Sequence, residues 1–218
     1  MKTDSQIQTD VMQELKFDPS LSAEAIGVSV SGGIVTLSGA VPSYAEKSAA
    51  ERATQRVAGV RAVVEKIEVS LPGSSKKDDS DLAKAIVGQF KWSVQVPDEW
   101  VRARVENGWV ELTGQVEWDY QRTAAESCVR GLTGVRGISN HISIKSKVIQ
   151  PDVVKKKIEE AFRREADREA RRIAVEVKGT KVILSGEVHS FTDLNDAKWA
   201  AWSAPGVTSV ENNLHISG

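Results

Sequence analysis

Few of the residue types that usually carry chemistry occur in this chain of 218 residues, which has three histidines and one cysteine. Histidine, cysteine and carboxylate side chains at short spacings bind metal ions, and a cysteine beside a histidine can be a nucleophile. His141, His189 and His215 share no spacing, and Cys128 stands where two similar stretches of the chain have alanine. We therefore expect no metal ion, no cofactor and no catalytic residue, and we interpret Cys128 as a small core residue.

Glycine-rich stretches could bind phosphate, but their spacing here is wrong for that chemistry. Gly39 lacks the following Lys-Ser/Thr of a P-loop, and the Gly-x-Gly-x-x-Gly pattern is absent. Turns and strand ends need glycine because it adopts positive φ angles without strain. We interpret six glycines as structural in this sense: Gly39, Gly114, Gly186, Gly59, Gly134 and Gly206.

These glycines belong to a pattern that occurs three times, in the stretches 33–39, 108–114 and 180–186. In the first two the pattern is Gly-x-Val-x-Leu-x-Gly, in the third Thr180 replaces the first glycine, and a Gly-Val pair follows each. The period of about 73 residues is the size of a small domain and too long for a solenoid repeat. The chain therefore consists of three copies of one module.

Each module is predicted to contain the elements αββαβ. Apolar residues at four-residue spacing indicate a first helix, for which Asp4-Ser5 and Asp81 are plausible caps. Alternating residues around a two-residue turn indicate a hairpin, and an alanine-lined second helix and a third strand follow. A strand-helix-strand crossover pairs its strands in parallel. The fold class is therefore α+β, with two helices on one face of a three-stranded mixed sheet and the other face open.

We place module 1 at residues 1–72, a flexible linker at 73–79, module 2 at 80–147 and module 3 at 148–218. The short connection after module 2 predicts a more fixed relation between modules 2 and 3. No module has the large basic excess of a duplex-binding protein, and the net charge is −1, so nucleic acid is not an expected partner.

The first ten residues contain no apolar signal core, and no stretch is long and apolar enough to span a membrane. We expect a cytoplasmic protein as the sequence is written, and a periplasmic one only if this chain is a processed form.

The order αββαβ, the repeated Gly-x-Val-x-Leu-x-Gly strand and the later Gly-Val pair resemble the BON domain, named for bacterial osmotic-shock and nodulation proteins. The resemblance covers nearly the whole chain. It implies a non-enzymatic module that binds phospholipid or associates with membranes in proteins of osmotic and envelope stress.

The residues that differ between copies are candidates for contact with a partner. Ile34, Trp109 and Lys181 share one outward position of the second strand, and Trp118 is one of four tryptophans in module 2. Trp109 fits two interpretations equally: contact with lipid, another module or a client, or burial beneath another module of the chain.

A basic stretch opens module 3 and is a second candidate. Its cations can contact anionic lipid. Acidic residues between them favour the other interpretation, a helix face exposed to solvent on which the cations form ion pairs, such as Glu159 with Arg163 and Glu160 with Arg164. The candidate cations are Lys155, Lys156, Lys157, Arg163 and Arg164.

Two functions follow from these observations. The leading hypothesis is a non-catalytic, stress-associated protein whose modules bind phospholipid or membrane surfaces. The alternative is a soluble chaperone or scaffold that holds a protein client or associates with itself.

Overall fold

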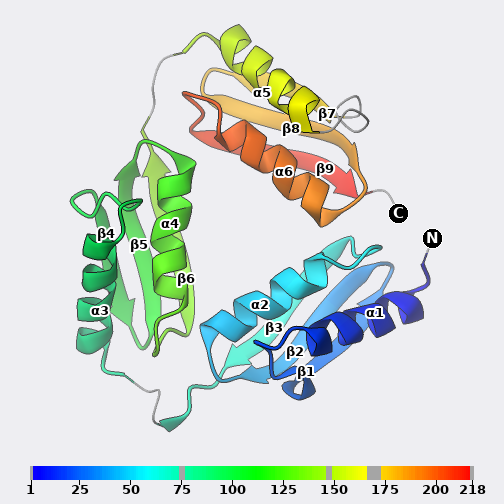
Figure 1. Cartoon of the computed structure of the whole chain (residues 1–218), viewed down its shortest axis with the longest axis vertical. Helices are drawn as coiled ribbons and strands as arrows, with labels where there is room; N and C mark the ends of the chain where they lie inside the picture. The colour runs from blue at the N-terminus through cyan, green and yellow to red at the C-terminus, as the bar shows by residue number, and fades with distance from the viewer. Residues whose placement is uncertain (1, 74–76, 146–148, 166–172, 217–218) are drawn as a thin grey trace. The chain divides into compact units, whose positions relative to one another are not determined.

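The structure, a computed structural model, describes residues 2–73, 77–145, 149–165 and 173–216, and includes only the backbone of residues 163–165. The order αββαβ occurs three times (Figure 1), which confirms the predicted α+β fold. Module 1 also has a one-turn 3-10 helix, Ala23–Ala25, before its first strand.

The elements of module 1 are α1 (Asp4–Phe17), β1 (Ile26–Ser31), β2 (Ile34–Val41), α2 (Tyr44–Gln55) and β3 (Ala62–Val69). Module 2 contains α3 (Asp79–Trp92), β4 (Val101–Glu106), β5 (Trp109–Val116), α4 (Asp119–Arg130) and β6 (Gly137–Ile144), and module 3 contains α5 (Pro151–Glu165), β7 (Ile173–Lys178), β8 (Lys181–Val188), α6 (Phe191–Trp202) and β9 (Ser209–Ile216).

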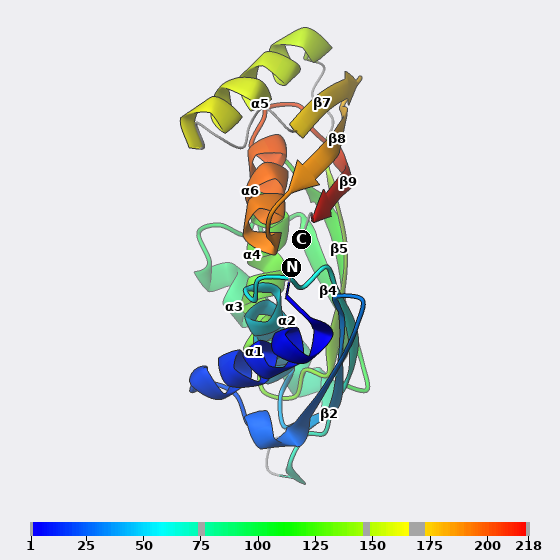
Figure 2. The same ribbon diagram turned by 90° about the vertical axis from the view of Figure 1, so that its right-hand side faces the viewer.

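Each sheet has three strands, with the second strand of the module in the middle. In module 1, β1 pairs antiparallel with β2, and β2 pairs in parallel with β3, so the sheet is mixed as predicted. Module 3 repeats these pairings. Figure 2 shows α5 and α6 together on one side of the strands of module 3.

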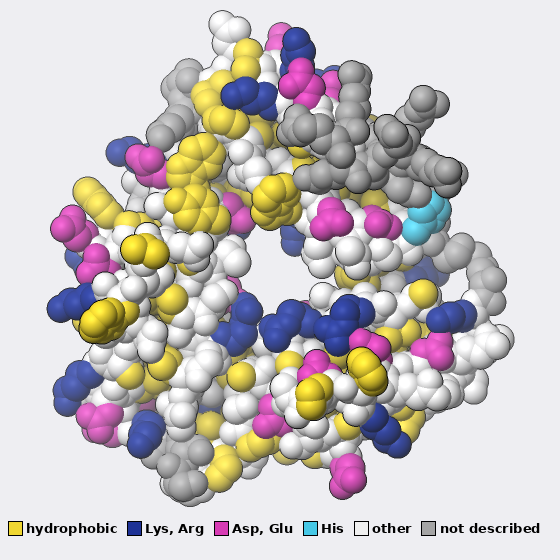
Figure 3. Space-filling view, viewed as in Figure 1, with side chains coloured by type: hydrophobic (Ala, Val, Ile, Leu, Met, Phe, Trp, Pro, Cys, Tyr) yellow, Lys and Arg dark blue, Asp and Glu magenta, His cyan; other side chains and the backbone are white. Residues whose placement is uncertain are grey.

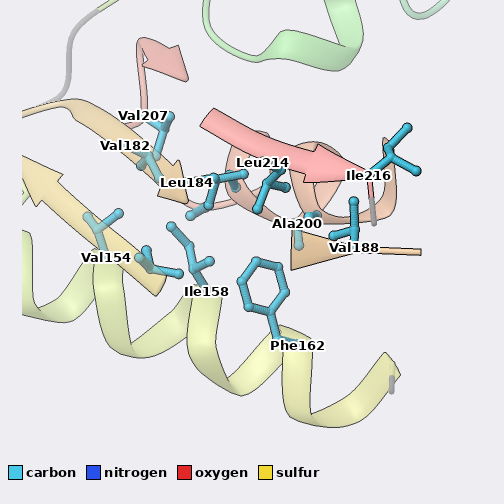
Figure 4. Packing of buried hydrophobic residues seen from close by; sticks show 14 residues of the cluster. Val154, Ile158, Phe162, Val182, Leu184, Val188, Ala200, Val207, Leu214 and Ile216 are labelled. Atoms are coloured by element: carbon cyan, nitrogen blue, oxygen red, sulfur yellow. The ribbon is translucent and has the colours of Figure 1, made fainter. Parts of the chain in front are cut away.

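The core of each module lies between its helices and its sheet. In module 3, Val154, Ile158 and Phe162 of α5 point toward Val182 and Leu184 of β8 (Figure 4). The same strand positions in the other modules, Val35 with Leu37 and Val110 with Leu112, are also fully buried. Alternation along the strand thus gives each module a core of its own.

The helix starts differ from the prediction that Asp4-Ser5 and Asp81 are caps. Thr3 caps α1 in a capping box with Gln6, so Asp4 is the first residue of the helix. The helix α3 begins at Asp79, with Asp78 before it. Asp4 therefore lies in the first turn of α1, and both Asp79 and Asp81 lie in the first turn of α3.

The aspartate in the first turn binds the hairpin of its own module. The Asp4 carboxylate accepts hydrogen bonds from the main-chain N–H groups of Gly32 and Gly33, at 2.8 and 2.9 Å. Asp79 accepts from Asn107 and Gly108 in the same way, at 2.7 and 2.9 Å. Pro151 occupies this place in module 3, so a carboxylate from this position is available only in modules 1 and 2.

The last strand of every module forms an edge of its sheet, and a side chain covers part of that edge. The N–H of Ile67 donates to Glu65, that of Ile142 to Asn140 and that of Leu214 to Asn212. In module 1, Lys47 also donates to the carbonyl oxygen of Ile67 at 2.6 Å and pairs with Glu65 at 2.7 Å. These contacts occupy main-chain groups that would otherwise be open to another strand.

Candidate interaction surfaces

The shared outward position of the second strand pairs with the last strand in a different way in each module. Ile34 stands opposite Ala62 in an uncharged part of the sheet. Trp109 donates from Nε1 to the Ser139 hydroxyl at 2.9 Å. Lys181 forms an ion pair with Glu211 at 2.5 Å, and hydrogen bonds from Lys181 and then Asn213 hold the pKa of Glu211 below its ordinary value of 4.5.

Trp109 is held against its own sheet. A Cβ atom added to Gly137 would lie 2.3 Å from Cζ3 of Trp109, 2.5 Å from Cε3 and 2.7 Å from Cη2. Three such similar distances to adjacent ring atoms place that point above the ring and not beyond its edge. The indole therefore lies flat over Gly137, and its side chain is 52% exposed.

A hollow of about 290 Å³ lies beside this ring, on module 2. Arg104 stands opposite Glu111 in the β4–β5 register, and Glu106 stands opposite Trp109. Arg104 contacts Glu106 at 2.8 Å and Glu111 at 3.9 Å. The lining consists of Arg104, Glu106, Asn107, Trp109 and Glu111.

A second aromatic surface of module 2 comprises Trp92, Val94 and Trp100, here called the tryptophan end. Trp92 is 89% exposed at the end of α3, and Trp100 is 65% exposed before β4. Val94, in the loop between them, is fully exposed. Exposed apolar side chains mark a contact surface where they lie together, so these three residues of one short segment are candidates for such a surface.

The four tryptophans of module 2 do not form one cluster. Asp79 holds the start of α3 to the β4–β5 hairpin, so Trp92 at the other end of this helix lies away from the hairpin. Trp109 is the first residue of β5, directly after the two-residue turn of the hairpin. Trp118 lies in the loop between β5 and α4 and is partly buried. Of these tryptophans only Trp109 and Trp118 were predicted from the sequence as contact residues, and Trp92, Val94 and Trp100 were not.

The basic candidates of module 3 lie on α5, where Lys155, Lys156 and Lys157 are exposed. Lys155 is 3.9 Å from Glu159, one turn away, which agrees with the solvated face of ion pairs. The side chains of Arg163 and Arg164, and residues 166–172, lie outside the described part of the chain. On the face shown in Figure 3, acidic and basic side chains both occur among hydrophobic ones.

The residues considered for chemistry belong to different elements of the modules. His141 and His215 are exposed on β6 and β9, and His189 is exposed before α6. Cys128 is partly buried on α4, whereas Ala53 and Ala200 at the same place are buried. Among the described residues, no three His, Cys, Asp or Glu side chains converge as metal ligands would. None of the described helices has the length and apolar character needed to cross a membrane.

Comparison with known families gives three matches along the chain. A BON domain profile matches residues 3–70, 78–146 and 152–218. The chain belongs to the BON domain family. The resemblance seen in the repeated strands is thereby confirmed, and each match contains one αββαβ unit of the structure.

One curated relative and two solved structures are similar to this BON protein. Osmotically-inducible protein Y of Escherichia coli (strain K12) is 30% identical over 146 residues, which are 65% of this chain and 73% of that protein. Two structures of CdsD, a structural protein of the type III secretion system of Chlamydia trachomatis, show 12% identity and a TM-score of 0.28. One covers 96% of this chain and 91% of its own, and the other, of the C-terminal domain, covers both chains fully. At this TM-score they support no functional comparison.

Proposed function

We propose that this protein is a non-catalytic protein of the osmotic stress response and that module 2 binds phospholipid surfaces through the tryptophan end. The stress role is supported by the similarity to osmotically-inducible protein Y. The membrane role is supported by one observation, the high exposure of Trp92, Val94 and Trp100 within nine residues.

Indole rings suit the interface of a bilayer because the ring is apolar and its N–H remains hydrated. The charges near the tryptophan end balance, with Lys91 and Arg102 against Asp98 and Glu99. The Arg102 guanidinium donates to the carbonyl oxygens of Asp98 and Glu99, at 3.3 and 2.8 Å, which keeps its charge beside the loop. Binding through this surface therefore depends on apolar contact more than on the charge of the lipid.

Vesicle flotation tests the membrane role. We expect the whole chain to float with zwitterionic and with anionic vesicles, and salt to weaken binding only slightly because the local charges cancel. The double variant Trp92→Ala/Trp100→Ala should lose this association. Trp199→Ala, which removes a tryptophan 62% exposed on α6, is the matched control and should retain it. Absence of flotation at low salt would exclude the proposed membrane role.

A protein-binding function is the alternative, and the open sheet face of module 1 favours it. Ile34 is 45% exposed and Val64 is 40% exposed, and Val64 pairs with Thr36 in the register. Neighbouring outward residues of β1 are Ser29 and Ser31, so this part of the face is uncharged. An uncharged, partly apolar sheet can cover an apolar segment of a client without leaving a charge unpaired.

The double variant Ile34→Lys/Val64→Glu tests this alternative, because module 3 carries Lys181 and Glu211 at the same two places. The variant should keep the fold while adding charges to the face. If the chain suppresses aggregation of a client protein, the variant should lose that activity. Equal suppression by the variant and the parent chain would exclude this face as the client site.

A further inference from the structure

We propose that the hollow beside Trp109 is a binding site for an organic cation, with a quaternary ammonium group over the exposed face of the indole. This proposal is independent of the proposed function, because Trp109 lies at the hairpin and the tryptophan end lies at the other end of α3.

The ring is fixed in position before any ligand binds. Gly137 supports one face of the indole and Ser139 accepts the hydrogen bond of its Nε1. The ring therefore keeps its open face toward solvent without a cost in side-chain entropy on binding. A tryptophan face is the aromatic surface that attracts cations most strongly.

The charges of the lining select the sign of the ligand. Glu106 and Glu111 provide two carboxylates and Arg104 one guanidinium, which leaves one negative charge. The Arg104 and Glu106 side chains are 72% and 67% exposed, so their ion pair is a weak competitor for the carboxylates. The lining therefore favours a cation over an anion, and the volume of about 290 Å³ suits a ligand smaller than a typical drug.

The sister modules show why module 2 differs. In module 3 the position of Trp109 is occupied by a cation, Lys181, whose ammonium lies 2.5 Å from Glu211 at the place of Ser139, and the counterparts of Glu106 and Glu111 are Lys178 and Ile183. In module 1 the corresponding position is Ile34, on an uncharged part of the sheet. Module 2 combines an aromatic face with uncompensated negative charge, and the cation must come from outside.

Choline chloride, titrated into the whole ¹⁵N-labelled chain, is the test. We expect the indole N–H resonance of Trp109 to shift with a dissociation constant on the order of 10–100 mM, as a single partly exposed cation–π contact with charge assistance gives. Potassium chloride at equal ionic strength should shift it much less, since the potassium ion has no methyl groups to place on the ring.

Variants separate the site from general effects. Trp109→Ile, with the module 1 residue, should weaken choline binding about tenfold, followed in this variant by the main-chain amide resonances of Glu106, Asn107 and Glu111, which line the hollow. Glu111→Gln should weaken it severalfold. Trp199→Phe is the control and should change nothing. Equal responses to choline and potassium, or choline binding that survives Trp109→Ile in a folded module 2, would overturn the proposal.

Two sources of the ammonium group can be distinguished with the same chain. Phosphatidylcholine vesicles that bind through Trp109, with loss in Trp109→Ile, would identify the lipid headgroup as the ligand. Choline binding together with vesicle binding that ignores Trp109→Ile would identify a free solute. A shift of the same resonance by a neutral sugar as strong as that by choline would overturn the assignment to a cation.

Discussion

Asp4 joins two elements that lie 28 residues apart in the sequence, the first turn of α1 and the β1–β2 hairpin. Its two oxygens each accept one main-chain N–H, from Gly32 and Gly33. These hydrogen bonds hold the pKa of the Asp4 carboxyl below its ordinary value of 3.8, because they stabilise the ionised form. An aspartate near a predicted helix start indicates a cap, and nothing in the local sequence indicates the distant hairpin as its partner.

Asp4→Ala should destabilise module 1 at neutral pH. The pKa is lowered in the folded chain, so the contribution of Asp4 is complete above the unfolded value near 3.8 and is lost as the pH falls through the lower folded value. Urea unfolding followed by the amide resonances of module 1 should show a difference between variant and parent at pH 7 that closes in strong acid. Asp10→Ala, an exposed carboxylate paired with Lys2, is the control. A difference that persists below the folded pKa would contradict this account.

Gly137 is the residue that lets Trp109 lie flat. Gly137→Ala would place a methyl group 2.3 Å from a ring carbon, so the indole has to move away and lose its hydrogen bond to Ser139. We expect module 2 to lose about 1–3 kcal/mol of stability, as overpacked sites do, and the indole N–H of Trp109 to exchange faster with solvent. Unchanged exchange at Trp109 in a folded variant would show that the ring does not depend on Gly137.

The sequence predicts which strand residues are buried, but not the contacts at the edges of the sheets. The period-two alternation that predicts the hairpins also accounts for the burial of Leu37, Leu112 and Leu184, because burial follows the side of the sheet. The same alternation says only which face of the sheet a side chain lies on. It does not predict that Glu65, Asn140 and Asn212 accept hydrogen bonds from main-chain N–H groups at the edge of the sheet. The exposure of Val94 also escaped prediction, since an apolar residue in a loop carries no periodic signal.

Glu65→Ala should expose the edge of β3. The N–H of Ile67 loses its acceptor and Lys47 loses its ion-pair partner, so the edge can pair with a strand of another molecule. We expect self-association that increases with protein concentration, measured by sedimentation velocity. Glu68→Ala removes an exposed carboxylate of the same strand and is the control. It should self-associate no more than the parent chain does. Equal association of both variants would attribute the effect to lost charge.

The three modules share a fold but not a set of supporting contacts. Modules 1 and 2 have the aspartate that binds the hairpin, and both hairpin residues there have positive φ. Among the described residues other than glycine, Asn107 alone has positive φ, so the turn at Gly179-Thr180 differs. Thr180 is instead joined to Thr208 through their hydroxyl groups at 2.8 Å. We infer that module 3 has the weakest hairpin.

Ile158→Ala tests whether the cores are independent. Ile158 is fully buried in the core of module 3, and its truncation should cost about 2–5 kcal/mol. A module of this size has about 3–5 kcal/mol of stability, so module 3 should lose most of its stability and unfold at a much lower urea concentration than in the parent chain. The amide resonances of modules 1 and 2 should keep their folded positions. Unfolding of all three modules would show that their stabilities are coupled.

The different partners of Ile34, Trp109 and Lys181 restrict how such modules can recombine during evolution. A crossover between the second and last strands would bring Trp109 against Ala62 or Ser209, where a Cβ atom replaces the open space of Gly137. It would also part Lys181 from Glu211. Gene fusions that preserve whole modules avoid both faults, so exchange is expected at the connections between modules, and a consensus built by averaging the three copies position by position would mix incompatible pairs.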